Sequence, residues 1–380
     1  MERTIRAYAK RARIRWYSDN APTALNVLFF GSDRFSVHSL NALRQLREEN
    51  PGLINKLQVV TRRAKKCGRN LSQTREVPIV KASSRIGLPP PINCDSTKDM
   101  LGPVMKTLKE GGFNMIVAVS FGKLISRELI AQVPYTLNVH PSLLPQYKGS
   151  SPIQHTLLNG DVCTGVSVQT LHPEKFDHGN IIAQTNPLKV SKLLETQSGQ
   201  HETDPNTPPK VARLMDSLGS VGGKLLAHVL RDRLYEANRF VSSQYPASYA
   251  PKITTEMRQV HWGNDSACDA LRKFDSLGPL YTFKQIYKKN SQVAQFKRVI
   301  FHHLAPVADC NMCPKTAGEF EFDSAQNCLL IPFTDGKFLK CTSIQFEGHK
   351  IEAPDQFIKS LRKRCGELYN TRVFSEAPIK

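Results

Sequence analysis

The stretch Leu137-Asn-Val-His-Pro-Ser-Leu-Leu-Pro-Gln-Tyr-Lys-Gly-Ser-Ser-Pro-Ile-Gln154 begins as a short apolar strand and then turns at two prolines. Side chains of a strand alternate between its faces, so Asn138 and His140 project to the same side. In an open parallel sheet, ligands bind beyond the carboxyl ends of the strands. We therefore expect a strand over residues 136–140 that ends in a polar ligand-binding site.

Other segments predict the rest of the sheet. Residues 25–31 form a continuous apolar run that ends in Gly31, which is typical of a parallel strand buried on both faces. Residues 57–60 and 112–122 repeat this pattern, and apolar residues at helical spacing follow the first strand. G-x-G-x-x-G is missing there, so a dinucleotide site is unsupported. We predict an α/β, Rossmann-like domain with a mostly parallel sheet over residues 23–238.

The second half of the chain has a different texture. Short strand-like segments with turn signals follow residue 240, and Asp335-Gly336 lies between two apolar runs as a hairpin signal. These features predict a small OB-like β-barrel over residues 253–380, joined by a linker at 239–252. A chain of 380 residues suits two domains.

The charge of the chain is its strongest global feature. Lysine and arginine number 52 against 33 acidic residues, which gives a net charge of +19 and a pI near 9.6. Such an excess favours a polyanionic partner, most plausibly nucleic acid, because phosphate contacts release counterions. The alternative is basicity that serves targeting and solubility. Apolar runs fall short of the roughly 20 residues that span a bilayer, so we expect no membrane association.

Residues 1–22 form an arginine-rich, acid-poor start without an apolar secretory core. This composition predicts a mitochondrial targeting segment, and the alternative is a basic arm that binds nucleic acid. The nine cysteines lack a regular framework, which indicates reduced thiols. Cys310 and Cys313 form a C-x-x-C without a second close pair, so we expect no zinc site.

A second loop supplies a further candidate group. Asp177 precedes a glycine turn in the loop after the strand that begins at Thr164. An asparagine amide can donate to a developing oxyanion, a histidine can move protons near neutral pH, and an aspartate can orient the histidine. These residues indicate an acyl-transfer site. On the residue types alone, a structural histidine and a turn-capping aspartate remain open.

The central motif is typical of one enzyme family. Asn138-x-His140 is followed by Ser142-Leu143-Leu144-Pro145, Gly149 and, further along, Asp177-x-Gly179. This pattern resembles the formyltransferases that use 10-formyltetrahydrofolate. Tyr249-Ala-Pro-Lys-Ile253 and Trp262 resemble the interdomain junction of the methionyl-tRNA formyltransferases, and the chain is most similar to their mitochondrial members.

The resemblance implies a function and its residues. A formyl group would pass from 10-formyltetrahydrofolate to the α-amino group of initiator methionyl-tRNA in the mitochondrial matrix, without a metal. The implied catalytic residues are Asn138, His140 and Asp177. The implied folate-site residues are Ser142, Leu143, Leu144 and Pro145, with Val119, Phe121 and Gly122 as a further wall. We expect a monomer.

The charge of the chain indicates which molecule accepts the formyl group. Residues 61–75 contain no acid and hold the predicted tRNA-binding residues, which are Arg62, Arg63, Lys65, Lys66 and Arg69. The alternative is a solvated charge run. The other functions left open are transfer to a small amine, hydrolysis of formyl-folate, and RNA binding without catalysis. The basic second domain favours a tRNA substrate.

Overall fold

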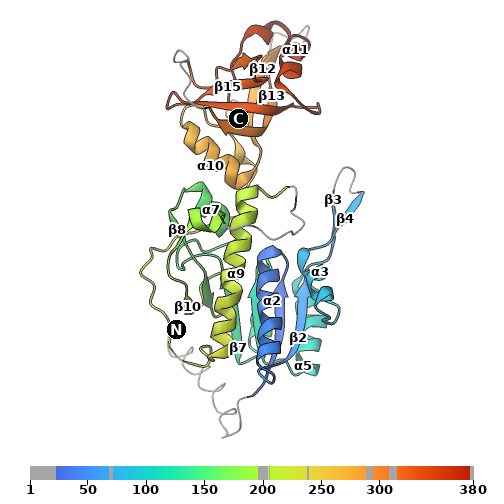
Figure 1. Ribbon diagram of the computed structural model, residues 1–380. Coiled ribbons are helices and arrows are strands. Elements are labelled where there is room, and N and C mark those ends of the chain that lie inside the picture. Colours follow the sequence, from blue (N-terminus) through green and yellow to red (C-terminus); the bar gives the residue numbers. More distant parts are fainter. Residues whose placement is uncertain are drawn as a thin grey trace.

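A computed structural model of the protein describes residues 23–67, 72–195, 204, 206–237, 239–287, 294–307 and 315–376. The predicted leader at 1–22, Arg69 and the Cys310/Cys313 pair lie outside these residues. Two units are stacked end to end, with the larger one built from the first part of the chain (Figure 1). Helix α10 (Ala267–Leu277) lies at the junction between them.

The larger unit is built on a seven-stranded sheet. Its order is β10-β9-β7-β6-β1-β2-β5. The strands are β1 (Leu25–Gly31), β2 (Ile54–Thr61), β5 (Ile92–Asn93), β6 (Met115–Val119), β7 (Tyr135–His140), β9 (Ser167–Gln169) and β10 (Ile181–Gln184). The first five of these in sequence pair in parallel, while β9 and β10 are antiparallel. The prediction of a mostly parallel α/β fold is confirmed.

Both faces of this sheet are covered, which explains the continuous apolar runs. Along β1, Val27 and Phe29 enter one apolar cluster, whereas Leu28 and Phe30 enter another. This alternation follows the period of two in a strand. Helices α2 (Arg34–Glu49) and α9 (Pro209–Arg231) supply the first cluster, and helices α5 (Met105–Glu110) and α6 (Arg127–Ile130) supply the second.

Helices α2 and α9 approach closely through glycine. A Cβ added at Gly223 of α9 would lie 2.9 Å from the carbonyl oxygen of His38 and 3.0 Å from the Cβ of Ala42, both on α2. Contacts this short cannot be relieved by turning a side chain, because one partner is backbone. The glycine therefore sets the distance between the two helices.

We expect Gly223→Ala to lower the free energy of unfolding by about 1 to 3 kcal/mol, because overpacking outweighs the better helix propensity of alanine. Urea titration of the full chain would measure this. Gly102→Ala is the matched control, since no described atom outside its own helix and neighbours lies within 4 Å of the added Cβ. Equal stability of both variants would contradict the close-packing argument.

The smaller unit is an antiparallel sheet with the order β12-β13-β16-β15-β14, and β17 pairs with β16. Its strands are β12 (Leu280–Tyr287), β13 (Ala294–Pro306), β14 (Glu321–Asp323), β15 (Cys328–Pro332), β16 (Phe338–Phe346) and β17 (Ile351–Glu352). The predicted Asp335-Gly336 turn joins β15 to β16, with Gly336 at φ +71°. Helix α11 (Pro354–Cys365) and the 3₁₀ turn η4 (Gly366–Asn370) complete the unit. Within the described strands, β12 and β14 are not paired, so a closed barrel is not shown.

The remaining elements are short. They are β3 (Lys65–Cys67), β4 (Gln73–Arg75), α3 (Pro78–Arg85), α4 (Thr97–Asp99), η2 (Met100–Val104), α7 (Pro152–Leu158), β8 (Cys163–Thr164), β11 (Leu188–Lys189), α8 (Val190–Glu195) and η3 (Glu256–Arg258). None of the helices in the described ranges is long and apolar enough to cross a membrane. Within those ranges there is also no group of three or more His, Cys, Asp or Glu side chains that could hold a metal ion.

Candidate active site

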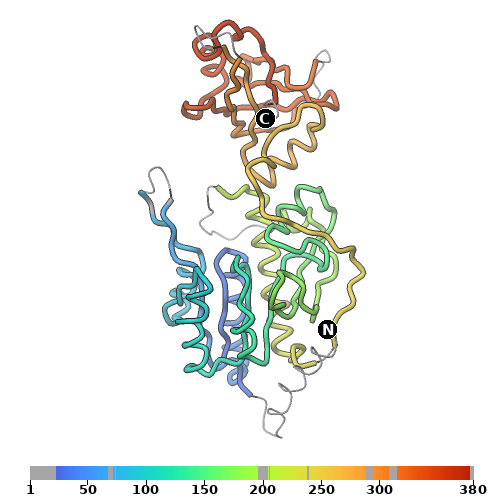
Figure 2. The backbone as a smooth tube through the Cα atoms, turned by 180° about the vertical axis from the view of Figure 1, so that it is seen from behind, coloured from blue at the N-terminus to red at the C-terminus, as the bar shows by residue number. Residues whose placement is uncertain are grey.

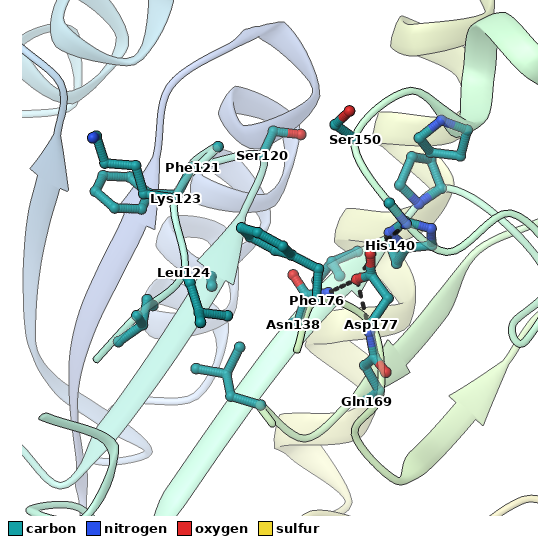
Figure 3. Close-up of a pocket in the computed structure, with 18 of the residues that line it drawn as sticks. Ser120, Phe121, Lys123, Leu124, Asn138, His140, Ser150, Gln169, Phe176 and Asp177 are labelled. Carbon is teal, nitrogen blue, oxygen red and sulfur yellow. Dashed lines mark hydrogen bonds and ion pairs between the residues drawn. The ribbon is translucent and has the colours of Figure 1, made fainter. Parts of the chain in front are cut away.

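Four polar side chains meet at the carboxyl end of the central sheet. Asn138 and His140 lie at the end of β7, Gln169 ends β9, and the loop after β9 brings in Asp177 (Figure 3). All four line a cavity of about 410 Å³, a size typical of small-molecule sites. The structure thus brings together the three side chains predicted as the catalytic set and adds a fourth.

The carboxylate of Asp177 is the centre of this arrangement. Its Oδ1 accepts hydrogen bonds from Asn138 Nδ2 and from Gln169 Nε2, both at 3.0 Å. Its Oδ2 accepts from the backbone N–H of Gly149 at 2.8 Å. His140 Nδ1 lies 3.3 Å from Oδ1, and both side chains of this ion pair are buried. Groups from two strands and one loop therefore hold this carboxylate in one orientation.

The two nitrogens of His140 have different tasks. Nε2 lies 2.8 Å from the carbonyl oxygen of Tyr147, and a carbonyl can only accept, so Nε2 carries a proton. Nδ1 faces the Asp177 carboxylate. The doubly protonated imidazolium satisfies both contacts, whereas a neutral ring would turn a lone pair toward the carboxylate. Nδ1 is therefore the ring atom that can exchange a proton with the cavity.

Unusual backbone conformations bring these groups together. Asp177 itself has φ +56°, a backbone conformation that residues other than glycine rarely adopt. Contacts with the rest of the protein must therefore stabilise its loop. Two residues on, a Cβ at Gly179 would lie 1.7 Å from the Thr170 carbonyl oxygen. Only glycine lets the loop pass so close to the end of β9. The Asp-x-Gly spacing thus has a steric cause.

The rest of the cavity combines an apolar wall with a charged edge. Phe121, Leu124, Ile125 and Ile130 form the apolar part, and Phe176 stands beside Asp177 (Figure 3). Asp33 and Arg62 lie at the charged edge. A flat, mostly apolar ligand with a few polar groups is the kind that such a wall accommodates.

Comparison with known proteins identifies the family. The model for "Formyl transferase" matches residues 25–199. The mitochondrial methionyl-tRNA formyltransferase of Saccharomyces cerevisiae is 44% identical over 95% of this chain and 96% of its own length. That of Homo sapiens is 30% identical over 70% of this chain and 60% of its own length. The chain belongs to the methionyl-tRNA formyltransferase family.

Solved structures agree on the fold of this formyltransferase. HypX from Aquifex aeolicus, in a multiply substituted variant, superposes with a TM-score of 0.51 at 15% identity, over 94% of this chain and 49% of its own. An N-formyltransferase from Helicobacter canadensis has a TM-score of 0.50 at 14% identity, over 83% and 98%. At these identities the likeness concerns the fold alone.

The predicted folate residues divide into two groups. Phe121 and Gly122 line the cavity, but Val119 is fully buried in the core of the sheet. Ser142, Leu143, Leu144 and Pro145 also lie outside the cavity wall. Their backbone groups have partners within the protein, because Ser167 Oγ accepts from Leu144 N–H and donates to Ser142 O, and Gln184 donates to Leu144 O.

The predicted tRNA-binding residues are also placed differently from one another. Lys65 and Lys66 are exposed on the β3–β4 hairpin, which projects toward the smaller unit (Figure 1). Arg63 is half-exposed and contacts two acids, Asp95 at 3.4 Å and Asp99 at 3.6 Å. Arg62 lies in the cavity wall instead, with its buried Nε unpaired among the described atoms.

Sequence reasoning missed Gln169 and the N–H of Gly149 as partners of Asp177. Gln169 is opposite Asn138 in the register of β7 and β9, and both side chains therefore reach the same carboxylate. A polar residue at the end of an apolar strand was the available signal. The antiparallel pairing that gives it meaning is not readable from the chain.

Asp33 is a second titratable group at the cavity. It caps α2 by accepting the N–H of Ser36 at 3.0 Å. Burial raises its pKa from 3.8 to about 6, against the opposing effects of hydrogen bonds from Ser36 and Ser120 and the charge of Arg62. The charged form is therefore disfavoured in the folded protein, and the carboxyl titrates in the weakly acidic range.

This shift predicts a pH dependence of stability. Because the folded pKa lies above the unfolded one, the free energy of unfolding falls as pH rises from about 4 to about 6 and stays lowered above that. Asn caps a helix as well as Asp. We expect Asp33→Asn to stabilise the protein by about 1 to 2 kcal/mol at pH 8, and by clearly less at pH 5. Urea titrations at both pH values measure this, and an equal effect at both would contradict the assignment.

Proposed function

We propose that this protein transfers the formyl group of 10-formyltetrahydrofolate to the α-amino group of methionyl-tRNA in mitochondria. The observation that supports this chemistry is that Asn138 and His140 both contact the carboxylate of Asp177 in the cavity. The mitochondrial names of the relatives support the location.

The cavity suits a folate as co-substrate. Its apolar side chains provide a surface for a flat pterin, while the amide and carboxylate at one end can meet the reacting centre. The folate supplies a formyl group bound to nitrogen N10. Phe121 and Gly122 remain the proposed folate-site residues among those named from the sequence, together with Leu124 and Ile125.

Each catalytic side chain has a defined task. Asn138 donates one amide N–H in a hydrogen bond to Asp177. Its second amide N–H can donate to the formyl oxygen as negative charge develops there. Asp177 accepts the proton that the amine loses when its nitrogen bonds to the formyl carbon. His140, through Nδ1, returns a proton to N10 as the bond between carbon and N10 breaks. Gln169 and the Gly149 N–H keep Asp177 in place.

The tRNA would lie across both units. The β3–β4 hairpin, which carries Lys65 and Lys66, projects toward the basic smaller unit (Figure 1). We propose that the hairpin contacts phosphates of the acceptor arm and that the smaller unit is an OB-like tRNA-binding domain. The domain bounds 23–238, 239–252 and 253–380, and a monomeric state, belong to this proposal.

The function is tested by formyl transfer from labelled 10-formyltetrahydrofolate to methionyl-tRNA. We expect Asp177→Asn and His140→Ala to lower kcat by about a hundredfold or more, since each removes a group used in the transition state. Asp232→Asn, at the far end of α9, is the control and should keep full activity. Release of formate to water at the same rate without tRNA would instead identify a hydrolase.

Reversing charge on the hairpin tests the tRNA contact. We expect Lys65→Glu together with Lys66→Glu to raise the KM for methionyl-tRNA and to flatten its salt dependence, because each lost phosphate contact lowers the slope by about 0.7 to 0.9. The KM for the folate should not change. The control reverses Lys106 and Lys109, which are exposed on α5 away from the hairpin. An unchanged salt slope in the hairpin variant would reject this contact.

A further inference from the structure

The linker between the two units is paired to the loop that follows β7. Residues 239–252 run along the outside of the larger unit before they enter the smaller one (Figure 2). Lys148 N–H donates to Ser248 O at 2.9 Å, and Ala250 N–H donates to Lys148 O at 2.7 Å. Ser248 N–H also donates to Pro145 O at 3.2 Å. Residues 248–250, the linker strand, therefore act as an added strand on this loop.

The loop held by the linker strand touches two of the three proposed catalytic side chains. The Tyr147 carbonyl oxygen accepts from His140 Nε2, and the Gly149 N–H donates to Asp177 Oδ2. Lys148, which lies between them, is the residue bridged to the linker strand. The linker strand is thus connected through one loop to the histidine on one side and to the aspartate on the other.

One linker side chain acts on this loop directly. Ser248 Oγ accepts the backbone N–H of Tyr147 at 2.9 Å. The N–H and the carbonyl of one residue belong to two successive peptide planes that meet at its Cα. Ser248 contacts both planes around Tyr147, since its Oγ accepts the Tyr147 N–H and its carbonyl accepts the N–H of Lys148, which lies in the plane that carries the Tyr147 carbonyl. Tyr147 therefore has Ser248 at its N–H and His140 at its carbonyl.

Tyr147 needs such support because its backbone is strained. It has φ +58°, which costs about 1 to 2 kcal/mol for a residue with a side chain. Its phenol is anchored, since the hydroxyl donates to Asp161 at 2.6 Å and accepts from Asn159 at 2.7 Å. These contacts hold the ring, whereas the peptide planes on either side of the Tyr147 Cα donate their N–H groups to Ser248, one to Oγ and one to the backbone carbonyl.

We propose that Ser248 is a positioning residue for formyl transfer, which acts through the two peptides on either side of Tyr147 to hold His140 with Nε2 on the Tyr147 carbonyl and Nδ1 toward Asp177. This inference rests on the proposed function. Ser248 touches none of the reacting groups. The linker strand is thereby part of the catalytic apparatus, and it ties the smaller unit to the proton-transfer site.

Three variants of the full chain test the proposal. Ser248→Ala removes the acceptor, and Ser248→Thr keeps a hydroxyl at this half-buried position. Ser243→Ala is the matched control, because Ser243 Oγ accepts the Tyr245 N–H at 3.3 Å within the same linker but away from the loop. We expect Ser248→Ala to lower kcat by about tenfold or more, with both KM values within about twofold. Ser248→Thr and Ser243→Ala should stay within about twofold of the parent kcat.

A second measurement does not depend on turnover. Nitrogen-15 NMR of labelled histidine, with His140 assigned by His140→Gln, reports the exchange of the Nε2 proton with water. We expect slow exchange in the parent, Ser248→Thr and Ser243→Ala, and exchange about tenfold faster in Ser248→Ala. Thermal melts of all variants show whether each is folded at the assay temperature.

The outcomes separate the two proposals. The positioning role would be overturned if Ser248→Ala had the same kcat as the parent protein, or if only its KM values changed. An unchanged rate of His140 proton exchange in Ser248→Ala would overturn it as well. Faster exchange together with lower kcat and rescue by threonine supports it. Should the parent protein transfer no formyl group, the proposed function fails, while the NMR comparison still decides whether Ser248 holds His140.

Discussion

The site depends on one carboxylate that accepts hydrogen bonds from several directions. Asp177 receives the amides of Asn138 and Gln169, the N–H of Gly149 and the ring edge of His140. These donors come from two strands and the loop after β7. Because a buried carboxylate is costly without partners, its presence forces those segments into one geometry. The catalytic arrangement and the local packing are consequently the same set of contacts.

The two units are joined by more than a flexible connection. Lys210 at the start of α9 pairs with Asp275 on α10 at 2.6 Å, and the linker strand lies on the loop at the active site. Most contacts that hold a substrate as large as a tRNA lie far from its reacting amine. A rigid connection lets binding at a distant surface place the amine within reach, which is the entropic part of catalysis.

Much of the fold follows from local pattern. The apolar runs of β1 and β6 indicate strands buried on both faces, and the prolines after His140 mark the end of β7. The proposed catalytic set, Asn138, His140 and Asp177, was named from its motif. Two features are not visible in that pattern, since the backbone of Ser142 and Leu144 is occupied by Ser167, and Arg62 lies in the cavity wall. Both depend on contacts with residues distant in sequence.

The sequence by itself determined the family, the parallel sheet and the residue types at its carboxyl end, because these depend on periodicity and on a contiguous motif. Only the tertiary structure decided the partners. The register of β7 with β9 pairs Asn138 with Gln169, and the return of the linker places Ser248 on the Tyr147 peptide. Such pairings arise from where the chain crosses itself, and short-range pattern carries no information about residues 101 positions apart.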